Sequence, residues 1–342
     1  MVQEGVQAID LRPNAQRAPL RVPFVDLQRQ SRDLRAELEA AFVSVLDRAA
    51  YTMGPELSAF EGEFADLCGC EYAVGVSSGT DAVKLALLGA GVEPGDEVIV
   101  PVNTFIATAE AVIHAGGVPV FTDVDIDTWC MTADAARPHL TWDTKAIVAV
   151  DLFGNPAPYN DLYRLGLPVI EDACQAAGAT YMTKMCGAFG NAAAFSFYPS
   201  KTLAACGDGG AVTTDDDEIA RRVRLLRHHG SADGTVHHEV GGTHRLDELQ
   251  AAALRLRLHD LDATVQDQRR EAWQLREAGH RLQIETAGGE SSWHRHVTCE
   301  LGATGRRYYD PPLHLQPSMR PYWRCPLPVA ERFARRNVCL SS

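Results

Sequence analysis

Short, almost continuous apolar runs alternate with longer helical patterns between residues 72 and 170, and this alternation restricts the fold more than any other feature. The runs are rich in Val and Ile, which favour strands. A strand without polar alternation is buried on both faces, and parallel neighbours require a crossover helix between them. The sequence therefore predicts a doubly wound α/β domain with a mostly parallel sheet. The predicted strands are 73–76, 98–101, 119–121, 146–150 and 167–170, with helices at 80–89 and 106–115.

The regions on either side of this alternation have other patterns. Residues 1–20 mix Pro, Arg, Gln and Ala without periodicity, which predicts a loose tail. Apolar residues at helical spacing predict one helix within residues 32–50 and a second, long helix from 246 to about 282. Residues 283–342 are irregular and supply too little apolar surface to fold alone, so we expect them to pack on the large domain. The predicted organisation is a tail (1–20), a large domain (21–250) and a linking helix with a small C-terminal domain (251–342).

Charge and cysteine usage limit the partners and the compartment. With 45 acidic and 32 basic residues the formal net charge is -13, which argues against a nucleic-acid or anionic-membrane surface. The sequence has no leader-like opening and no apolar run long enough to cross a bilayer, so we expect a cytoplasmic protein. The nine cysteines are scattered singly and are expected to be reduced thiols. Cys68-Gly69-Cys70 resembles half a metal site, but nothing downstream completes it, so we predict no metal.

The first chemical motif is Val76–Ala82, where a predicted strand meets a predicted helix through small residues. Free backbone N–H groups and the positive end of the helix dipole make such a junction an anion site. The hydroxyl groups of Ser78 or Thr80 are additional donors. The motif is therefore a candidate site for a cofactor phosphate, although helix capping alone also accounts for its composition.

The second motif, Val169–Gln175, ends a predicted strand with Glu171 and Asp172. Ligands of open α/β sheets bind at the carboxyl ends of the strands, which places Asp172 next to a ligand. Gln175 is within reach of a neighbouring oxygen of the same ligand. Glu171 points to the opposite face of the sheet and is expected to be structural. An Asp at such a position also commonly caps the next helix, so that alternative stays open.

The third motif centres on Lys201, which follows the aromatic run Phe195–Tyr198 and precedes the Gly-rich segment Gly207–Gly210. Such a stretch is typical of a protein interior, so this lysine is not expected to be a solvated surface charge. Desolvation beside a buried ligand lowers the pKa of an amine and makes it a better nucleophile. Ser196 and Ser200 are further candidate donors to a phosphate.

Lys201 and Asp172 together indicate one cofactor. A lysine amine forms a Schiff base with the aldehyde of pyridoxal phosphate (PLP), and a carboxylate keeps its pyridine nitrogen protonated so that the ring accepts electrons. Separate structural roles for the three motifs would require three coincidences in one sheet. We therefore predict a PLP enzyme. A nicotinamide-binding domain is disfavoured because no Gly-x-Gly-x-x-Gly follows the first strand.

Over roughly residues 22–262 the chain also resembles the DegT/StrS family of sugar aminotransferases, and the motifs follow one another in the family's order. The motifs that carry the resemblance are Gly54-Pro55-Glu56, Phe60-Glu61, Ser78-Gly79-Thr80-Asp81-Ala82, Pro94–Pro101, Thr104–Thr108, Glu171-Asp172-Ala173, Ser196–Lys201, Gly207–Gly210, His229-Gly230 and Arg245–Ala252.

The resemblance implies a fold-type I PLP enzyme that forms a homodimer with active sites at the subunit interface. It implies transfer of an amino group from glutamate or glutamine to a keto-sugar nucleotide, in amino-sugar biosynthesis for a natural product or a surface glycan. By the same resemblance, Lys201 is the Schiff-base lysine and catalytic residue, Asp172 pairs with the pyridine nitrogen, Gln175 contacts the ring hydroxyl, Phe105 stacks on the ring, Gly79, Thr80 and Ser196 hold the phosphate, and Arg245 reaches across the dimer to the other cofactor.

The chain departs from the family's pattern in two places. Thr243-His244 stands where members usually carry Asn-Ser or Asn-Tyr, and the stretch between 294 and 304 is short by most of a helix. A trimmed small domain permits a second hypothesis, a PLP-binding protein with a regulatory or partner role and little or no turnover. A third hypothesis is a sugar dehydratase of the same fold. Those relatives replace the lysine with histidine, whereas Lys201 is retained here.

Overall fold

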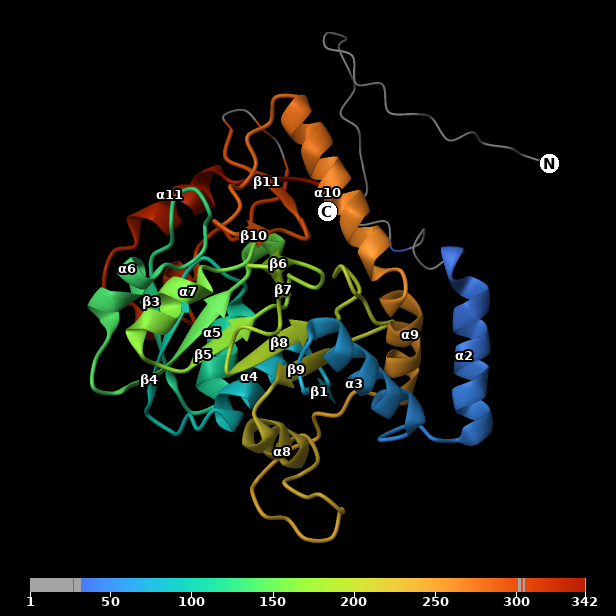
Figure 1. The fold of residues 1–342 in the computed structure, drawn as a ribbon. Helices are drawn as coiled ribbons and strands as arrows, with labels where there is room; N and C mark the ends of the chain where they lie inside the picture. Colours follow the sequence, from blue (N-terminus) through green and yellow to red (C-terminus); the bar gives the residue numbers. More distant parts are fainter. Residues whose placement is uncertain (1–26, 28–31, 301–302, 304, 342) are drawn as a thin grey trace, which may run out of the picture.

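The computed structural model describes residue 27, residues 32–300, residue 303 and residues 305–341. The tail predicted for residues 1–20 lies outside this part of the chain. A seven-stranded sheet with the strand order β1-β9-β8-β5-β4-β2-β3 forms the centre of the molecule (Figure 1). Its strands are β1 (Tyr72–Val76), β2 (Glu97–Pro101), β3 (Val118–Thr122), β4 (Thr144–Val150), β5 (Val169–Asp172), β8 (Ala192–Ser196) and β9 (Gly210–Thr214).

Most neighbours in this sheet are parallel, as the sequence predicts. The pairs β2–β3, β2–β4, β4–β5 and β5–β8 run parallel, and β9 runs antiparallel to both β8 and β1. Four of the predicted strands lie inside observed strands. The fifth, predicted at 167–170, is shifted, since β5 begins at Val169 and continues to Asp172. The shift brings the acidic pair of this motif into the strand itself.

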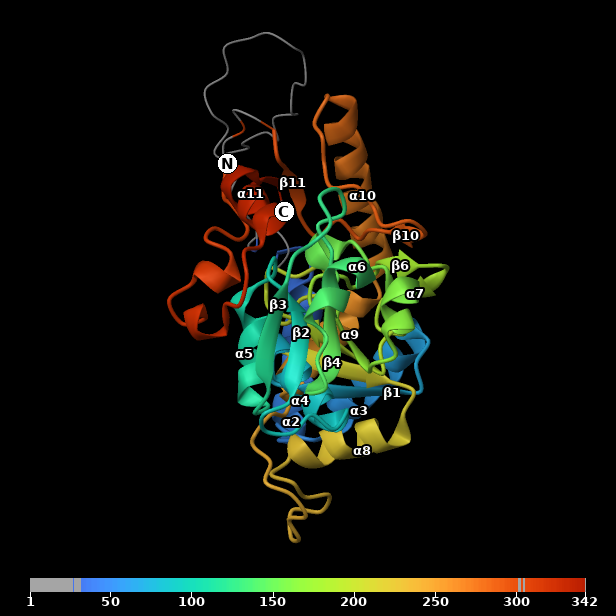
Figure 2. The same cartoon turned by 90° about the vertical axis from the view of Figure 1, so that its left-hand side faces the viewer.

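Helices cover both faces of the sheet (Figures 1 and 2). Successive residues of a strand point to opposite faces. In β8, Ala192 and Ala194 pack in the core on the side of helix α4, whereas Ala193 and Phe195 pack on the side of helix α3. The ring of Phe195 meets the ring of Phe64 edge to face at 4.9 Å. One layer contains α4 (Gly79–Gly89), α5 (Ile106–His114) and α8 (Asp217–Leu226), and the other contains α3 (Pro55–Cys68) and α9 (Glu248–Leu258).

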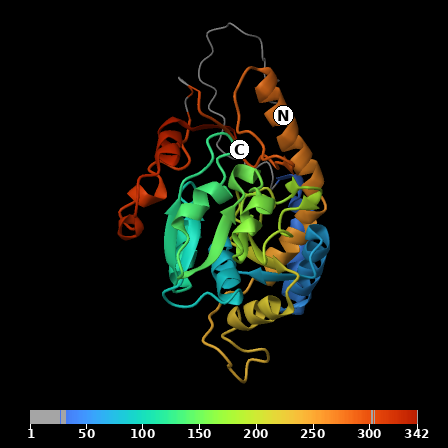
Figure 3. The same cartoon turned by 60° about the vertical axis from the view of Figure 1, so that its left-hand side comes forward.

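The helical predictions outside the sheet are partly correct. Helix α2 (Arg35–Arg48) lies within the range predicted at 32–50. The long helix predicted from 246 to 282 is wrong as a single element, because it consists of α9 and α10 (Leu261–Glu277). The break falls at His259 and Asp260, two residues with low helix propensity. Helix α10 then leads away from the large sheet (Figure 3).

Residues 283–342 contain more regular structure than the sequence suggests, so their description as irregular is wrong. Strand β10 (Gly289–Glu290) joins β6 (Thr180–Tyr181) and β7 (Lys184–Met185), and β11 (His296–Thr298) pairs with β12 (Val338–Ser341). The remaining helices are α6 (Ala133–Ala136), α7 (Tyr159–Leu162), α11 (Pro328–Arg336) and the 3-10 turns η1 (Arg137–His139), η2 (Leu152–Gly154), η3 (Tyr163–Leu165), η4 (Leu313–Leu315) and η5 (Arg320–Tyr322).

The C-terminal segment packs on the large sheet, as expected. Leu313, Leu327 and Phe333 join the same core as the strand residue Val100 (Figures 1 and 3). The domain boundary near residue 250 stays a prediction. Among the described residues no helix is long and apolar enough to cross a membrane.

Candidate active site

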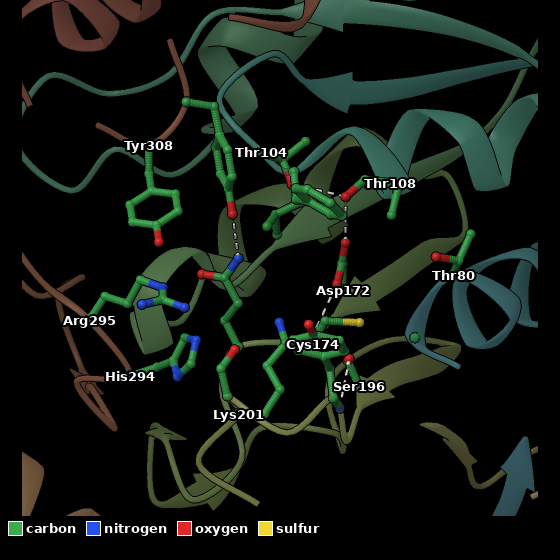
Figure 4. A pocket seen from close by; sticks show the side chains of 18 of the residues that line it. Thr80, Thr104, Thr108, Asp172, Cys174, Ser196, Lys201, His294, Arg295 and Tyr308 are labelled. Atoms are coloured by element: carbon green, nitrogen blue, oxygen red, sulfur yellow. Dashed lines mark hydrogen bonds between the residues drawn. The ribbon is translucent and has the colours of Figure 1, made fainter. Parts of the chain in front are cut away.

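A cavity of about 830 Å³ lies at the carboxyl ends of the parallel strands. One side is built from the segments that follow the strands, which contribute Thr108, Asp172 and Lys201. The C-terminal segment forms the other side with Arg295 and Tyr308 (Figure 4). The carboxyl ends of parallel strands meet at one edge of a sheet, which is why residues far apart in the sequence converge here.

Asp172 ends β5 and is only 5% exposed. The hydroxyl of Thr108 donates a hydrogen bond of 2.7 Å to Oδ2, and the backbone N–H of Cys174 donates one of 3.2 Å to Oδ1. The hydroxyl of Thr104 lies 2.9 Å from that of Thr108 and extends this network. The hydrogen bonds fix the orientation of the carboxyl group. Because residues 173–178 form turns, the alternative that Asp172 caps a following helix is wrong.

Lys201 directs its side-chain amine into the cavity (Figure 4). Its backbone N–H donates to the carbonyl of Tyr198 at 2.8 Å, which fixes the turn that carries it. Burial lowers the pKa of the amine, whereas the nearby Cys174 and Asp172 raise it. A lowered pKa increases the fraction of unprotonated, nucleophilic amine at neutral pH.

The anion site predicted at Val76–Ala82 is the N-terminus of α4. The hydroxyl of Ser78 caps this helix by accepting a hydrogen bond of 3.1 Å from the N–H of Asp81. Gly79 has no room for a side chain, since a Cβ there would lie 2.5 Å from the Cβ of Ser196. Ser78 therefore serves as a helix cap, and the cavity wall beside it is backbone with small hydroxyl side chains, including Thr80.

Gln175 and Phe105 form a further part of the wall. The side-chain carbonyl of Gln175 accepts a hydrogen bond of 2.9 Å from the N–H of Phe153, and its amide donates one of 3.0 Å to the hydroxyl of Tyr309. Phe105 precedes α5, and its ring centroid is 5.8 Å from that of Tyr309. Tyr309, which comes from the C-terminal segment, thus contacts both residues.

The cavity brings together most of the residues predicted from the sequence. Arg245 does not line this cavity, and its Nη1 lies 2.8 Å from Nδ1 of His228. Its predicted role concerns the second subunit and stays a prediction. The predicted residues that do line the cavity are Ser78, Gly79, Thr80, Phe105, Asp172, Gln175, Ser196, Ser200 and Lys201.

Several residues of the cavity were not predicted as site residues, among them Thr108, His294, Arg295 and Tyr309. Thr108 belongs to the motif Thr104–Thr108. Its hydroxyl lies one helical turn after Thr104, and this spacing was a sequence signal that Thr108 faces the site as well. His294, Arg295 and Tyr309 lie in the C-terminal segment, and only the return of this segment to the sheet places them in the same cavity as Lys201. Their sequence distance from the other motifs concealed that position.

Glu171 points away from the cavity and is structural, as predicted. Its carboxylate accepts hydrogen bonds from the N–H groups of Gly187 at 2.5 Å and Phe189 at 3.1 Å. Among the described residues, ligand atoms of Asp151, Glu171 and Cys186 lie within 4.8 Å of one another. Backbone N–H groups already donate hydrogen bonds to the carboxyl groups of Asp151 and Glu171. The three side chains therefore form a buried polar cluster. The absence of a metal stays a prediction.

Comparison with known proteins adds an independent line of observation. The model of the DegT/DnrJ/EryC1/StrS aminotransferase family matches residues 32–342. Over 93% of its length the chain is 40% identical to a UDP-N-acetyl-3-dehydro-alpha-D-glucosamine 3-aminotransferase of Acidithiobacillus ferrooxidans, and it covers 92% of that protein. The chain belongs to the DegT/DnrJ/EryC1/StrS aminotransferase family.

Two further relatives come from Streptomyces venezuelae. A dTDP-3-amino-3,4,6-trideoxy-alpha-D-glucose transaminase is 48% identical over 71% of this DegT-family chain, and the match spans 65% of that relative, just under two thirds of its length. The crystal structure of DesV, in complex with a ketimine intermediate, has a TM-score of 0.89 and 40% identity, with 94% of this chain and 92% of DesV covered. The predicted fold-type I architecture is confirmed.

PLP is the cofactor of this DegT-family aminotransferase, and the cavity fits it. The amine of Lys201 suits the aldehyde, the carboxyl group of Asp172 suits the ring nitrogen, and the N-terminus of α4 suits the phosphate. The lack of a Cβ at Gly79 lets the start of α4 pack closely against Ser196, which lines the same part of the wall. When bound, PLP supplies a ring that accepts electrons from the substrate carbon. The residues therefore suit the aldehyde, the ring nitrogen and the phosphate of the cofactor.

Proposed function

We propose that this aminotransferase transfers an amino group from glutamate or glutamine to carbon 3 of a keto-sugar nucleotide. The observation that carries the proposal is the convergence of Lys201 and Asp172 in one cavity of a family member. Both curated relatives described above are named for 3-amino sugars, one linked to dTDP and the other to UDP. Their names favour carbon 3 over carbon 4, which the sequence motifs leave open.

The side chains then have distinct roles in the reaction. Lys201 holds the cofactor, and once a substrate amine replaces it, its free amine moves a proton to and from the substrate carbon. The lowered pKa of Lys201 suits this role because a base must be unprotonated to act. Asp172, oriented by Thr108, faces the ring nitrogen. Gln175 contacts the ring hydroxyl, and Phe105 stacks on the ring.

A homodimer completes the proposed enzyme. Arg245 lies outside the cavity of its own chain, which agrees with a role in the second subunit's site. Helix α2 and the turn after it expose four large apolar side chains, a composition that suits contact with another copy. These side chains are Val43, Leu46, Tyr51 and Met53. The nine cysteines are free thiols, which agrees with a reducing compartment such as the cytoplasm.

The experiment that tests the function combines a spectrum with turnover. Protein purified with added PLP should absorb visible light, lose that band on borohydride reduction, and yield a labelled peptide that contains Lys201. With glutamate and a 3-keto sugar nucleotide it should release 2-oxoglutarate, whereas Lys201→Ala should release none and unfold like the wild type. A label on another amine contradicts the role of Lys201. A coloured protein without 2-oxoglutarate release supports the PLP-binding regulatory alternative instead, and loss of a sugar hydroxyl without amination supports the dehydratase.

A further inference from the structure

Arg295 is a buried cation in the wall of the active-site cavity. It directly precedes β11 and is only 8% exposed. Its guanidinium carbon lies 4.8 Å from the ring centroid of Tyr308, a contact that restricts the rotation of the side chain. Both residues line the cavity with Lys201. The C-terminal segment therefore holds a fixed positive charge against the reacting centre.

The positive charge of Arg295 lowers the pKa of neighbouring basic groups. Burial is the main cause that lowers the pKa of Lys201, and Arg295 lowers it further. The same holds for His294, whose pKa burial lowers well below the ordinary value of an imidazole, with Arg295 as the next cause. A buried guanidinium in a cavity wall is a strong site for an anion, because the anion offsets the same positive charge that lowers the pKa of Lys201 and of His294.

Arg295 lies on the substrate side of the cavity. In Figure 4, Arg295 and His294 lie on the opposite side of Lys201 from Asp172 and Thr80. The proposed positions of the cofactor's ring nitrogen and phosphate are beside Asp172 and Thr80. The space next to Arg295 is consequently left for the two substrates.

We propose that Arg295 binds a carboxylate group of a substrate beside Lys201, an inference that rests on the proposed function. In an amino-acid donor the carboxylate is bonded to the same carbon as the reacting amine, so it arrives next to Lys201. In a nucleotide sugar the diphosphate is separated from the ketone by the sugar ring, but a uronic acid would present a carboxylate of its own. The planar guanidinium binds either carboxylate through two parallel hydrogen bonds.

The test compares Arg295→Gln and Arg295→Lys with Arg276→Gln in the PLP-loaded enzyme. Arg276 is the matched control, because its guanidinium carbon lies 4.7 Å from the ring centroid of Trp293 and it does not line the cavity. Calorimetry measures binding of glutarate, an unreactive dicarboxylate, and of UDP-glucuronic acid against UDP-glucose. Loss of one partner of a buried charge pair predicts that Arg295→Gln weakens carboxylate binding about thirtyfold or more. Arg295→Lys should retain part of the affinity because it keeps the charge.

A single-turnover measurement separates the two sources of the carboxylate. The absorbance change of the cofactor is followed with L-alanine and with L-alaninol, which lacks the carboxylate. If the amino donor supplies the carboxylate, Arg295→Gln slows the reaction with L-alanine about thirtyfold or more relative to the reaction with L-alaninol, and it weakens the binding of glutarate. If the acceptor is the ligand, only the preference for UDP-glucuronic acid over UDP-glucose is lost.

The proposal is overturned if Arg295→Gln affects ligands with and without a carboxylate to the same extent, both in their calorimetric affinities and in their single-turnover rates. Unfolding curves of all three variants identify a folding defect, and Arg295→Lys keeps the test decisive if Arg295→Gln does not fold. Failure of the proposed function has a different signature. In that case the wild type itself transfers no amino group, while the binding measurements on the loaded protein still decide the role of Arg295.

Discussion

Two adjacent acids at the end of β5 have opposite surroundings. Asp172 faces the cavity, and its oxygens accept hydrogen bonds from the hydroxyl of Thr108 and the N–H of Cys174. Glu171 faces the other side of the sheet, where the backbone of Gly187 and Phe189 closes over it. Both side chains are almost completely buried. Burial of a carboxyl group therefore does not by itself indicate a candidate functional acid, whereas burial next to the cavity does.

The difference between the two acids follows from the alternation of side chains along a strand. Successive residues point to opposite faces, so an acidic pair at a strand end sends one carboxyl group to each side. One side is open here because β5 is followed by turns and Lys201 approaches from the neighbouring strand β8. The other side is filled by the segment between β7 and β8. One acidic side chain thus faces the cavity, and the acidic side chain before it binds the backbone on the other side of the sheet.

Among substitutions that test the comparison of the two acids, the largest effect is expected for Asp172→Asn. The amide retains the shape of the carboxyl group and an oxygen for the N–H of Cys174, but it loses the negative charge proposed to face the ring nitrogen. We expect kcat/KM to fall by about a hundredfold to a thousandfold, the range for removal of one preorganised electrostatic contact. The measurement is steady-state release of 2-oxoglutarate.

Unfolding of Asp172→Asn in urea without cofactor is the control, and the curve should match that of the wild type. Cofactor is left out because a bound ligand stabilises the folded state and would hide a direct effect. An activity close to that of the wild type would show that the charge of Asp172 is not required.

The same substitution in the neighbouring residue should affect stability instead. In Glu171→Gln one acceptor oxygen becomes an NH₂ donor, so the N–H of Gly187 or Phe189 loses its partner. A buried polar group left unsatisfied costs about 1–3 kcal/mol, and we expect the free energy of unfolding to fall by that amount. Urea unfolding checks the loss, and kcat of the protein that remains folded should change little. A large loss of activity at unchanged stability contradicts the division between the two acids.

Much of the fold was predictable from the sequence because the signal is local. Strands such as β4 contain a continuous apolar run, here residues 146–150, and burial of this run on both faces follows directly from that composition. The break between α9 and α10 was missed because Leu261 and Val265 continue the apolar spacing past Asp260. Strands β11 and β12 are not evident in the sequence because they are short and depend on pairing with segments distant in the sequence.

The candidate site was predictable on the side that the strands build. Asp172 and Lys201 each follow a strand of the predicted sheet, so topology alone brings them together. The side that holds Arg295 and Tyr309 was not predictable, since it depends on how the C-terminal segment packs back on the sheet. That packing rests on long-range contacts such as the one of Phe333 with Trp129, whose ring centroids are 4.5 Å apart.

A third acid, Asp151, should make the sealed side sensitive to pH. Burial raises the pKa of Asp151 well above its ordinary value, and Glu171 beside it raises the pKa further. The folded state therefore retains a proton that the unfolded chain releases above about pH 4. The stability contributed by this proton is full at lower pH and is lost as the pH rises toward the folded-state pKa.

Asp151→Asn cannot ionise and should not show this loss. Its oxygen can still accept the hydrogen bonds that Ala157 N–H and the Tyr159 hydroxyl donate to Oδ1. Relative to the variant, the wild type should lose up to about 1.4 kcal/mol for each pH unit in the affected window, measured by urea unfolding between about pH 5 and pH 8. Curves that stay parallel across this range would show that Asp151 ionises normally in the folded protein.

The smallest effect is expected for Thr108→Val, which removes the side-chain donor to Asp172 and keeps the shape of the side chain. The carboxyl group remains in the cavity with one hydrogen bond from Cys174, so its charge is preserved and only its orientation is loosened. We expect kcat/KM to fall by about threefold to tenfold, which corresponds to the loss of roughly one hydrogen bond. Thr122→Val is the matched control, because the Thr122 hydroxyl is also buried and donates to the carbonyl of Ala135 outside the cavity. Since the control loses a comparable hydrogen bond, both variants should lose similar stability, and only Thr108→Val should lose activity; equal activity in the two would mean that Thr108 does not position Asp172 for the reaction.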